Sequence, residues 1–142
     1  MTKYKDEDDY RDKFAAALEA RGWVTQRHED AYHNFIPDLS ISGNGIDGWV
    51  EVKYCKKTPL NLDCIAHYTK GQEMFLRRHG AAGSGHCYLL VGLSDWNLLI
   101  RWDALKGIRS CPFDALPSNI GVRGTKTIDE MAYFMNKHIS GK

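Results

Sequence analysis

The sequence predicts an α/β (α+β) fold, a sandwich of helices around a central mixed sheet. Apolar residues recur at helical spacing at both ends of the chain and in its middle. The segments between them alternate, or are apolar throughout, as strands do. The resulting order is a helix, three strands, a helix, two strands and a last helix, which suits layers packed on one core. A chain of 142 residues can bury such a core, and we expect one domain over residues 1–142.

The first part of the chain is expected to form a helix and three strands. The helix covers about residues 6–21, which carry an apolar stripe, and Gly22 is a candidate C-cap. Strands are then expected at residues 23–28, 36–42 and 49–53.

The second part is expected to form a helix, two strands and a final helix. The helix covers about residues 69–79 and should end at Gly80. Residues 86–93 form an apolar run typical of a buried central strand, and residues 97–102 are a further strand. Thr127 and Glu130 form a capping box that opens the last helix.

The composition is that of an ordinary globular protein and excludes several classes. Apolar residues make up 43% of the chain and charged residues 26%. No apolar run approaches the ~20 residues that span a bilayer, and the N-terminus is not signal-like. We therefore expect no membrane contact and a cytoplasmic location, in a bacterium, an archaeon or a virus-infected host. The net charge of +1 excludes a strongly basic protein that wraps nucleic acid, but it allows an enzyme with a local basic surface. The four cysteines form no CxxC pair, which argues against a zinc site or a disulfide framework.

A β-hairpin is expected around Asn44-Gly45, because both central residues of a type I′ turn need positive φ. Counting outward from this turn pairs Leu39 with Val50 and Asp38 with Glu51. Leu39 and Val50 would then share the core face of the sheet. The two acids would lie directly opposite each other on the other face, with Cβ atoms about 4.5–5.5 Å apart.

The opposed acids and a nearby amine suggest a metal site. Lys53 lies two residues beyond Glu51 and so projects from the same face. Mg²⁺ prefers oxygen ligands and is often held by one or two carboxylates, and such a site can activate water and stabilise charge on a phosphoryl group. Two alternatives stay open. In one, a turn at residues 47–48 breaks the direct opposition of the acids. In the other, Lys53 only offsets the two acids on a surface hairpin.

These residues resemble the PD-(D/E)xK nucleases. Pro37-Asp38 matches the PD of the motif, and residues 51–53, Glu-Val-Lys, match the ExK. The expected helix, hairpin, second helix and apolar strand resemble the αβββαβ core of the restriction-endonuclease-like fold. Residues 68–76 resemble the glutamine helix of the VRR-NUC and Holliday-junction-resolvase branches. The resemblance covers residues 6–93.

The resemblance implies a role for each matched residue. Asp38 and Glu51 would bind Mg²⁺ or Mn²⁺, with the backbone carbonyl of Val52 as a further ligand. Lys53 would orient the attacking water or help to deprotonate it, and would counter charge on the scissile phosphate. Gln72 would contact the site or substrate from its helix; the alternative is an ordinary solvated polar residue.

The family also places an acid on the first helix. Glu7 is the candidate, because at helical spacing it shares a face with Arg11 and the apolar stripe. An acidic helix start is also favourable against the helix dipole, so it needs no catalytic role. Arg11 occupies the position nearest the resolvase pattern, which is a departure from the family. The competing acids are Asp8, Asp9 and Asp12.

The function that the resemblance implies is Mg²⁺-dependent cleavage of DNA, with branched or junction DNA as substrate and a homodimer as the active form. Contacts with the DNA backbone are expected from Lys56, Lys57, Lys70 and Arg77. Trp49 would lie on the Glu51 face and could stack on unpaired bases, while His28 and His33 could approach the open end of the hairpin. Two other functions stay open: a catalytically inactive nucleic-acid-binding or inhibitor module of the same fold, and an RNA-directed nuclease.

Overall fold

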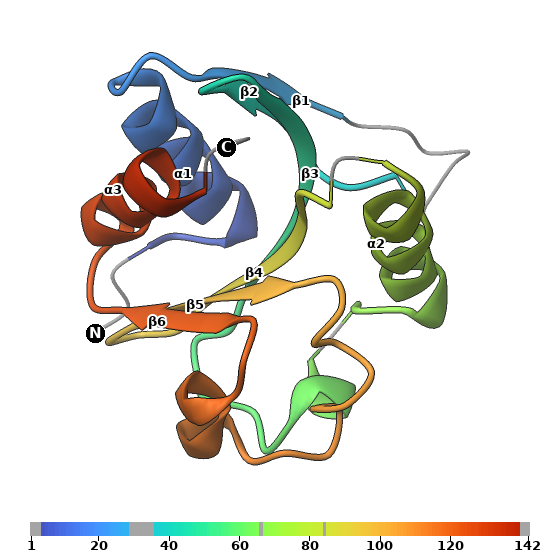
Figure 1. The fold of residues 1–142 in the computed structure, drawn as a ribbon. Helices are drawn as coiled ribbons and strands as arrows, with labels where there is room; N and C mark the ends of the chain where they lie inside the picture. The colour runs from blue at the N-terminus through green and yellow to red at the C-terminus, as the bar shows by residue number, and fades with distance from the viewer. Residues whose placement is uncertain (1–3, 29–35, 66, 84, 140–142) are drawn as a thin grey trace.

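A computed structural model describes residues 4–28, 36–65, 67–83 and 85–139, and its centre is a six-stranded mixed sheet with helices on both faces (Figure 1). The strands are β1 (Val24–Arg27), β2 (Leu39–Gly43), β3 (Ile46–Tyr54), β4 (Cys87–Gly92), β5 (Asn97–Arg101) and β6 (Val122–Thr125). The helices are α1 (Glu7–Glu19), α2 (Lys70–Ala82) and α3 (Ile128–His138), with short 3₁₀ helices η1 (Leu62–Cys64) and η2 (Phe113–Ser118). The predicted α+β class is confirmed. None of the helices in these ranges is long and apolar enough to cross a membrane.

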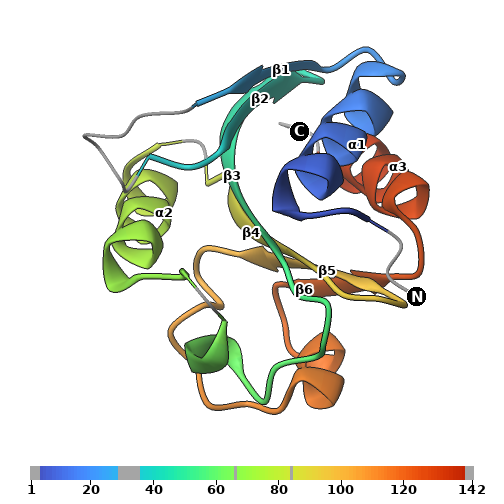
Figure 2. The same cartoon turned by 180° about the vertical axis from the view of Figure 1, so that it is seen from behind.

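The strands lie in the sheet in the order in which they occur in the chain. β1, β2 and β3 form an antiparallel meander, and so do β4, β5 and β6. β3 and β4 are parallel, and their connection contains α2. Figures 1 and 2 show α2 on one face of the sheet, with α1 and α3 side by side on the other.

Two apolar clusters fill the two faces. The cluster under α1 and α3 contains Leu39, Val50 and Val52 from the hairpin strands. The cluster on the α2 face contains Leu89 and Val91 from β4, the neighbours of Glu51 and Lys53 in the sheet. Alternate residues of β3 therefore point into different layers, as the strand period requires.

The hairpin between β2 and β3 has the predicted turn and register. Asn44 and Gly45 have φ values of 52° and 80°, as a type I′ turn demands. Gly43 pairs with Ile46 and Leu39 pairs with Val50. The alternative turn at residues 47–48 is therefore wrong, since these residues lie inside β3.

Two expectations about the later elements are wrong. The second helix does not end at Gly80 but continues to Ala82. Gly80 lies inside the helix, where it leaves room for the indole of Trp102: a Cβ at this position would lie 2.2 Å from Trp102 Cγ. The strand β6 was not expected, because its four residues carry a glycine and lack a clear alternation. The box at Thr127 is half formed: its side chain accepts from the Glu130 N–H at 3.0 Å, whereas the α2 box is complete.

Candidate active site

Asp38 and Glu51 meet where β2 begins beside the middle of β3. Asp38 directly precedes Leu39, which pairs with Val50, so it falls beside Glu51 on the neighbouring strand. The carboxylate of Asp38 accepts a hydrogen bond from the backbone N–H of Val52 at 3.0 Å. This bond fixes one acid to the strand that carries the other. The two acids therefore come together as the hairpin register predicts.

Lys53 lies beside Glu51 in the same layer. Its Nζ is 3.2 Å from Glu51 Oε2 and donates a hydrogen bond to the backbone carbonyl of His67 at 2.8 Å. Only 2% of Glu51 and 4% of Lys53 is exposed, which is rare for charged residues. The amine is thus held between a carboxylate and the segment that leads into α2.

Gln72 contacts Glu51 from the first turn of α2. Its Nε2 donates to Glu51 Oε2 at 3.2 Å. Its Oε1 accepts from the backbone N–H of Thr69 at 2.9 Å, and the Thr69 hydroxyl accepts from the Gln72 N–H at 3.2 Å. The residue therefore completes the α2 capping box and reaches the carboxylates at the same time.

Without a bound cation, the pKa values of both carboxyl groups lie above their usual range. Burial, and then the charge of Asp38, raise the pKa of Glu51 to about 8, although Lys53 opposes the shift. Burial also raises the pKa of Asp38, opposed by the Val52 N–H and by the charges of Lys53 and Arg11. Two buried acids side by side need a positive charge to stay ionised.

The donor set fits a hard divalent cation. Glu51 Oε1 is buried and has no hydrogen-bond partner within the described ranges, so one carboxylate oxygen is left for a ligand. In the same ranges no group of three or more histidine, cysteine, aspartate or glutamate side chains could hold a metal ion. The expected ligands, Asp38, Glu51 and the Val52 carbonyl, therefore stay a prediction in which the protein supplies only two carboxylates. Mg²⁺ commonly uses one or two carboxylates and takes its other ligands from water and substrate phosphate.

Glu7 is the acid of the first helix that lies nearest this site. Burial raises its pKa, the charge of Lys53 lowers it, and that of Asp38 raises it again. Glu7 and Lys53 also line the same hollow, of about 410 Å³. The competing acids form ion pairs with basic residues of the same helix: Asp8 and Asp12 with Arg11, and Asp9 with Lys13.

Arg11 is a second charged group of α1 turned toward the site. It is 5% exposed, and its positive charge lowers the pKa of Asp38. Its Nη2 is buried and has no hydrogen-bond partner among the described residues. The sequence marked Arg11 only as a departure from the family pattern and gave it no role.

The basic residues expected to contact DNA are divided between two places. Lys56 and Lys57 are exposed in the segment after β3 and line the hollow beside Lys53. Lys70 is exposed at the start of α2, and Arg77 is half-buried further along this helix. Neither of these two lines the hollow.

The histidine and tryptophan candidates form a separate aromatic group. The His28 ring lies 5.1 Å from that of Trp49, which lies 5.4 Å from Phe75. His28 Nε2 is also 2.9 Å from the Ser40 hydroxyl. Trp49 lies on the Glu51 side of the sheet, as expected, but it lines a different hollow from Lys53. His33 lies outside the described residues.

Arg109 holds together the segments that surround Lys53 and Gln72. Its Nε lies 2.9 Å from Asp63 of η1, and its Nη1 contacts Glu73 of α2. The Tyr68 hydroxyl donates to Glu73 at 3.0 Å. The sequence showed Arg109 only as one of several scattered basic residues, because its partners are 36 or more positions away.

The comparisons with known proteins agree with this architecture. No protein-family model and no curated protein sequence matches the chain. Among solved structures, the fold is similar to that of Hjc, a Holliday junction resolvase from the archaeal hyperthermophile Archaeoglobus fulgidus, with a TM-score of 0.53. The identity is 16%, over 87% of this chain and 97% of that one. Since so low an identity concerns the fold alone, it confirms the predicted restriction-endonuclease-like fold and its resolvase-like arrangement.

Proposed function

We propose that this chain is a metal-dependent endonuclease that hydrolyses phosphodiester bonds in DNA, preferably in branched DNA. The observation that carries the proposal is the buried contact of Glu51 with Lys53 beside Asp38, in a layer that would otherwise be apolar. Buried acids with shifted pKa values cluster at functional sites. The resolvase-like fold supports the same conclusion.

The metal would be held by Asp38, Glu51 and the Val52 carbonyl. A divalent cation bound there supplies a Lewis acid that lowers the pKa of water and offsets charge on phosphate oxygens. The Val52 N–H would hold the Asp38 carboxylate in place for this task by donating to one of its oxygens. The other oxygen would then bind the metal.

Lys53 would act on the water and on the phosphate. Its Nζ has donors beyond those used by Glu51 and the His67 carbonyl, since an ammonium carries three. A donor aimed at developing phosphoryl charge in a buried site stabilises the transition state. Gln72 would keep the Glu51 carboxylate oriented, and Glu7, on the wall shared with Lys53, would be the proton acceptor or third acid.

Branched DNA is proposed because the similar archaeal protein is described as a Holliday junction resolvase. The Lys56 and Lys57 side chains beside the hollow would contact the phosphates that enter it. Junctions have two strands to cut, so we propose that the active form is a homodimer, to be checked by light scattering of the purified protein.

Parallel cleavage assays test the proposal directly. Supercoiled plasmid, a four-way junction, a flap, linear duplex and RNA are incubated with Mg²⁺, with Mn²⁺ or with EDTA. We expect metal-dependent cleavage, fastest on the junction, and none in EDTA. The matched control is Asp38→Asn with Glu51→Gln, which removes both carboxylates at nearly unchanged volume.

Absence of metal-dependent cleavage in the wild type on every substrate would leave the inactive binding module as the better account. Cleavage of RNA alone would replace DNA by RNA as the substrate. Equal cleavage by the double variant would move the active site elsewhere.

A further inference from the structure

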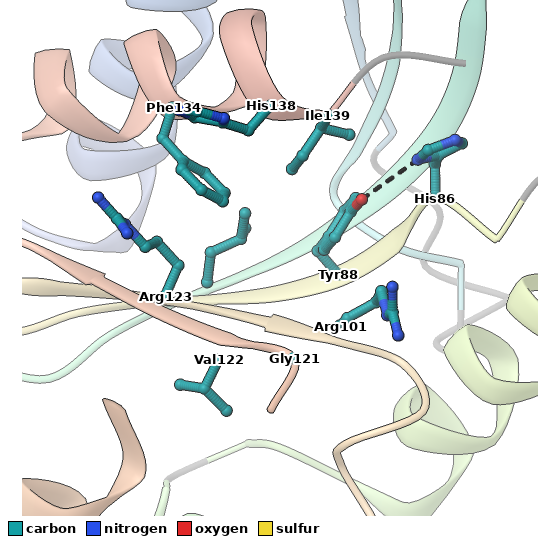
Figure 3. A pocket seen from close by; sticks show the side chains of 10 residues that line it. His86, Tyr88, Arg101, Gly121, Val122, Arg123, Phe134, His138 and Ile139 are labelled. Carbon is teal, nitrogen blue, oxygen red and sulfur yellow. Dashed lines mark hydrogen bonds between the residues drawn. The ribbon is translucent and has the colours of Figure 1, made fainter. Parts of the chain in front are cut away.

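A second hollow, of about 470 Å³, lies on the opposite face of the sheet from Glu51 and Lys53 (Figure 3). Its walls come from β4, β5, β6 and α3. Tyr88 and Leu99 line it and belong to the apolar cluster under α1 and α3. The Glu51 neighbour Leu89 belongs to the other cluster, so this hollow and the carboxylates occupy different faces.

The charged and titratable groups around this hollow, apart from a tyrosine, are cations or histidines. Arg101, Arg123, His86 and His138 line it, and within the described part of the chain no aspartate or glutamate does. His86 Nδ1 lies 3.2 Å from the Tyr88 hydroxyl, the dashed contact in Figure 3. A pocket whose polar groups are cationic is complementary to an anionic ligand.

Both arginines keep donors for a ligand. Arg101 donates hydrogen bonds from Nε and Nη2 to the Asp103 carboxylate, at 2.7 and 2.6 Å. Its Nη1 has no hydrogen-bond partner among the described residues. The guanidinium of Arg123 lies over the Phe134 ring, 4.8 Å from its centre, and has no carboxylate partner among the described residues. An exposed guanidinium stacked on a ring is oriented at little entropic cost and can still bind phosphate.

The middle of the hollow is apolar. In Figure 3 Arg123 and Arg101 lie on opposite sides, with Tyr88 next to Arg101 and with Phe134 and Ile139 above. Leu99 is almost fully buried and forms a fixed apolar floor. Apolar walls with a few polar groups are the usual lining of a ligand site, and this volume is within the usual range.

We propose that this hollow binds one internal nucleotide of a single-stranded nucleic acid, with a phosphate at each arginine and the sugar and base over the apolar floor. Each internal nucleotide of a strand presents an anion, an apolar ring and a second anion, which is the order of groups across the hollow. Guanidinium groups suit phosphate, because their planar donors form charge-assisted pairs with its oxygens. The site goes beyond the proposed cleavage reaction and does not require it.

Ligand binding in EDTA tests the site, because without metal the other face lacks the cation that would bind phosphate there. Calorimetric titrations compare thymidine 3′,5′-bisphosphate, thymidine 5′-monophosphate and thymidine. Fluorescence anisotropy follows a labelled short oligothymidylate, with the bisphosphate as competitor. The variant is Arg101→Gln with Arg123→Gln. The control, Lys106→Gln with Lys126→Gln, removes two exposed cations that do not line the hollow.

We expect the bisphosphate to bind more tightly than the monophosphate, and thymidine to bind least. The arginine variant should weaken binding of the bisphosphate and of the oligothymidylate by about tenfold or more, since each charge-assisted hydrogen bond contributes about that factor. The lysine control should bind both like the wild type, and circular dichroism should show all proteins folded.

Equal binding of thymidine and its bisphosphate would overturn the proposal, as would equal losses in the arginine and lysine variants. Unchanged oligothymidylate binding by the arginine variant would overturn the assignment to a strand. None of these outcomes depends on cleavage, so a failure of the proposed nuclease activity would be seen separately.

Discussion

The two faces of β3 are buried to the same degree and are built in opposite ways. Val50 and Val52 are 0% exposed and contact apolar side chains under α1 and α3. Glu51 and Lys53, which alternate with them, are 2% and 4% exposed and carry charge. From burial alone, both faces of this strand would be assigned to the core.

The difference between the faces lies in how well each side chain is satisfied. The valines lose nothing by leaving water, whereas one buried oxygen of Glu51 has no hydrogen-bond partner among the described residues. Burial, and then the charge of Asp38, raise the pKa of Glu51. Buried polar atoms without partners are few in native proteins and call for an explanation. The comparison teaches that one face of the strand stabilises the fold, while the other carries buried charge at some expense of stability, as the proposed metal site would require.

Removal of apolar volume should show the larger effect on stability. Leu90 is fully buried, pairs with Val52 in the sheet and lies in the same cluster. Leu90→Ala should lower the free energy of unfolding by about 2–5 kcal/mol, through lost burial and a cavity. Urea denaturation measures it, with Leu60→Ala, 72% exposed in the wild type, as the control that should change little. Equal losses in both variants would contradict the assignment of Leu90 to the core.

Removal of the amine from the charged face should affect cleavage rather than folding. Lys53→Ala should lower single-turnover cleavage by roughly 10²–10³-fold, the usual effect of removing one key electrostatic group. Binding should change much less, because one amine supplies one of several phosphate contacts. Lys106→Ala is the control, since Lys106 is exposed and far along the chain from the site. If Lys53→Ala cuts as fast as the wild type, another set of residues performs the reaction.

Metal binding to the charged face should raise the free energy of unfolding. Mg²⁺ should stabilise the wild type by RT ln(1 + [Mg²⁺]/Kd), about 2.7 kcal/mol at a concentration a hundred times Kd. Asp38→Asn with Glu51→Gln should abolish the gain, because no carboxylate remains. Calorimetric titration and thermal unfolding of both proteins check this expectation. Equal metal binding by the two proteins would exclude Asp38 and Glu51 as ligands.

The charged face should also weaken the protein as the pH rises without metal. The pKa of Glu51 is raised from 4.5 to about 8, so its contribution to stability is complete below pH 4.5 and is lost as the pH rises to about 8. In EDTA, Glu51→Gln should therefore exceed the wild type in stability above that pH, by on the order of 2 kcal/mol. Urea unfolding at about pH 5 and about pH 9 measures the difference. A difference that is the same at both pH values would show that the Glu51 carboxyl is not the cause.

The smallest effect is expected from the exposed lysines near the site. Lys56→Ala with Lys57→Ala should weaken DNA binding equally for all sequences. The slope of the logarithm of the binding constant against that of the salt concentration should become shallower, by the equivalent of about one to two phosphate contacts. Anisotropy titrations at several salt concentrations give the slope, with Lys106→Ala and Lys126→Ala as control. A slope equal to that of the wild type would show that these lysines are merely solvated.

The hairpin and its acids could be predicted because their information is local. Asn44-Gly45 determines the turn, the turn determines the register, and the strand period then places Lys53 on the Glu51 face. The starts of α1 and α2 were also near the expected ones, since Asp6 and Thr69 are capping residues. The general fold class followed from the same periodic patterns.

The rest depends on contacts between distant parts of the chain. Glu7 was the candidate among four acids of one helix start, but only the tertiary structure distinguishes it from the others, because it lies near Lys53 and Asp38. The Arg109 contacts to η1 and α2, and the four-sided hollow around Tyr88, join segments far apart in sequence. Gly80 was expected to end its helix because glycine is common just after helix C-termini, and only the distant Trp102 explains a glycine at this position.

The double attachment of Gln72 restricts which residues can occupy that position. A glutamate would close the capping box equally well, since its carboxylate can also accept from the Thr69 N–H. It could not, however, donate to Glu51, and it would add a further negative charge beside two buried acids. An alanine would satisfy neither the helix start nor the carboxylate, and a lysine could donate to Glu51 but could not accept from the Thr69 N–H. Helix initiation and the proposed catalysis thus share a single side chain. In a library that carries every amino acid at position 72, we expect full stability and full cleavage activity together only in the glutamine clones.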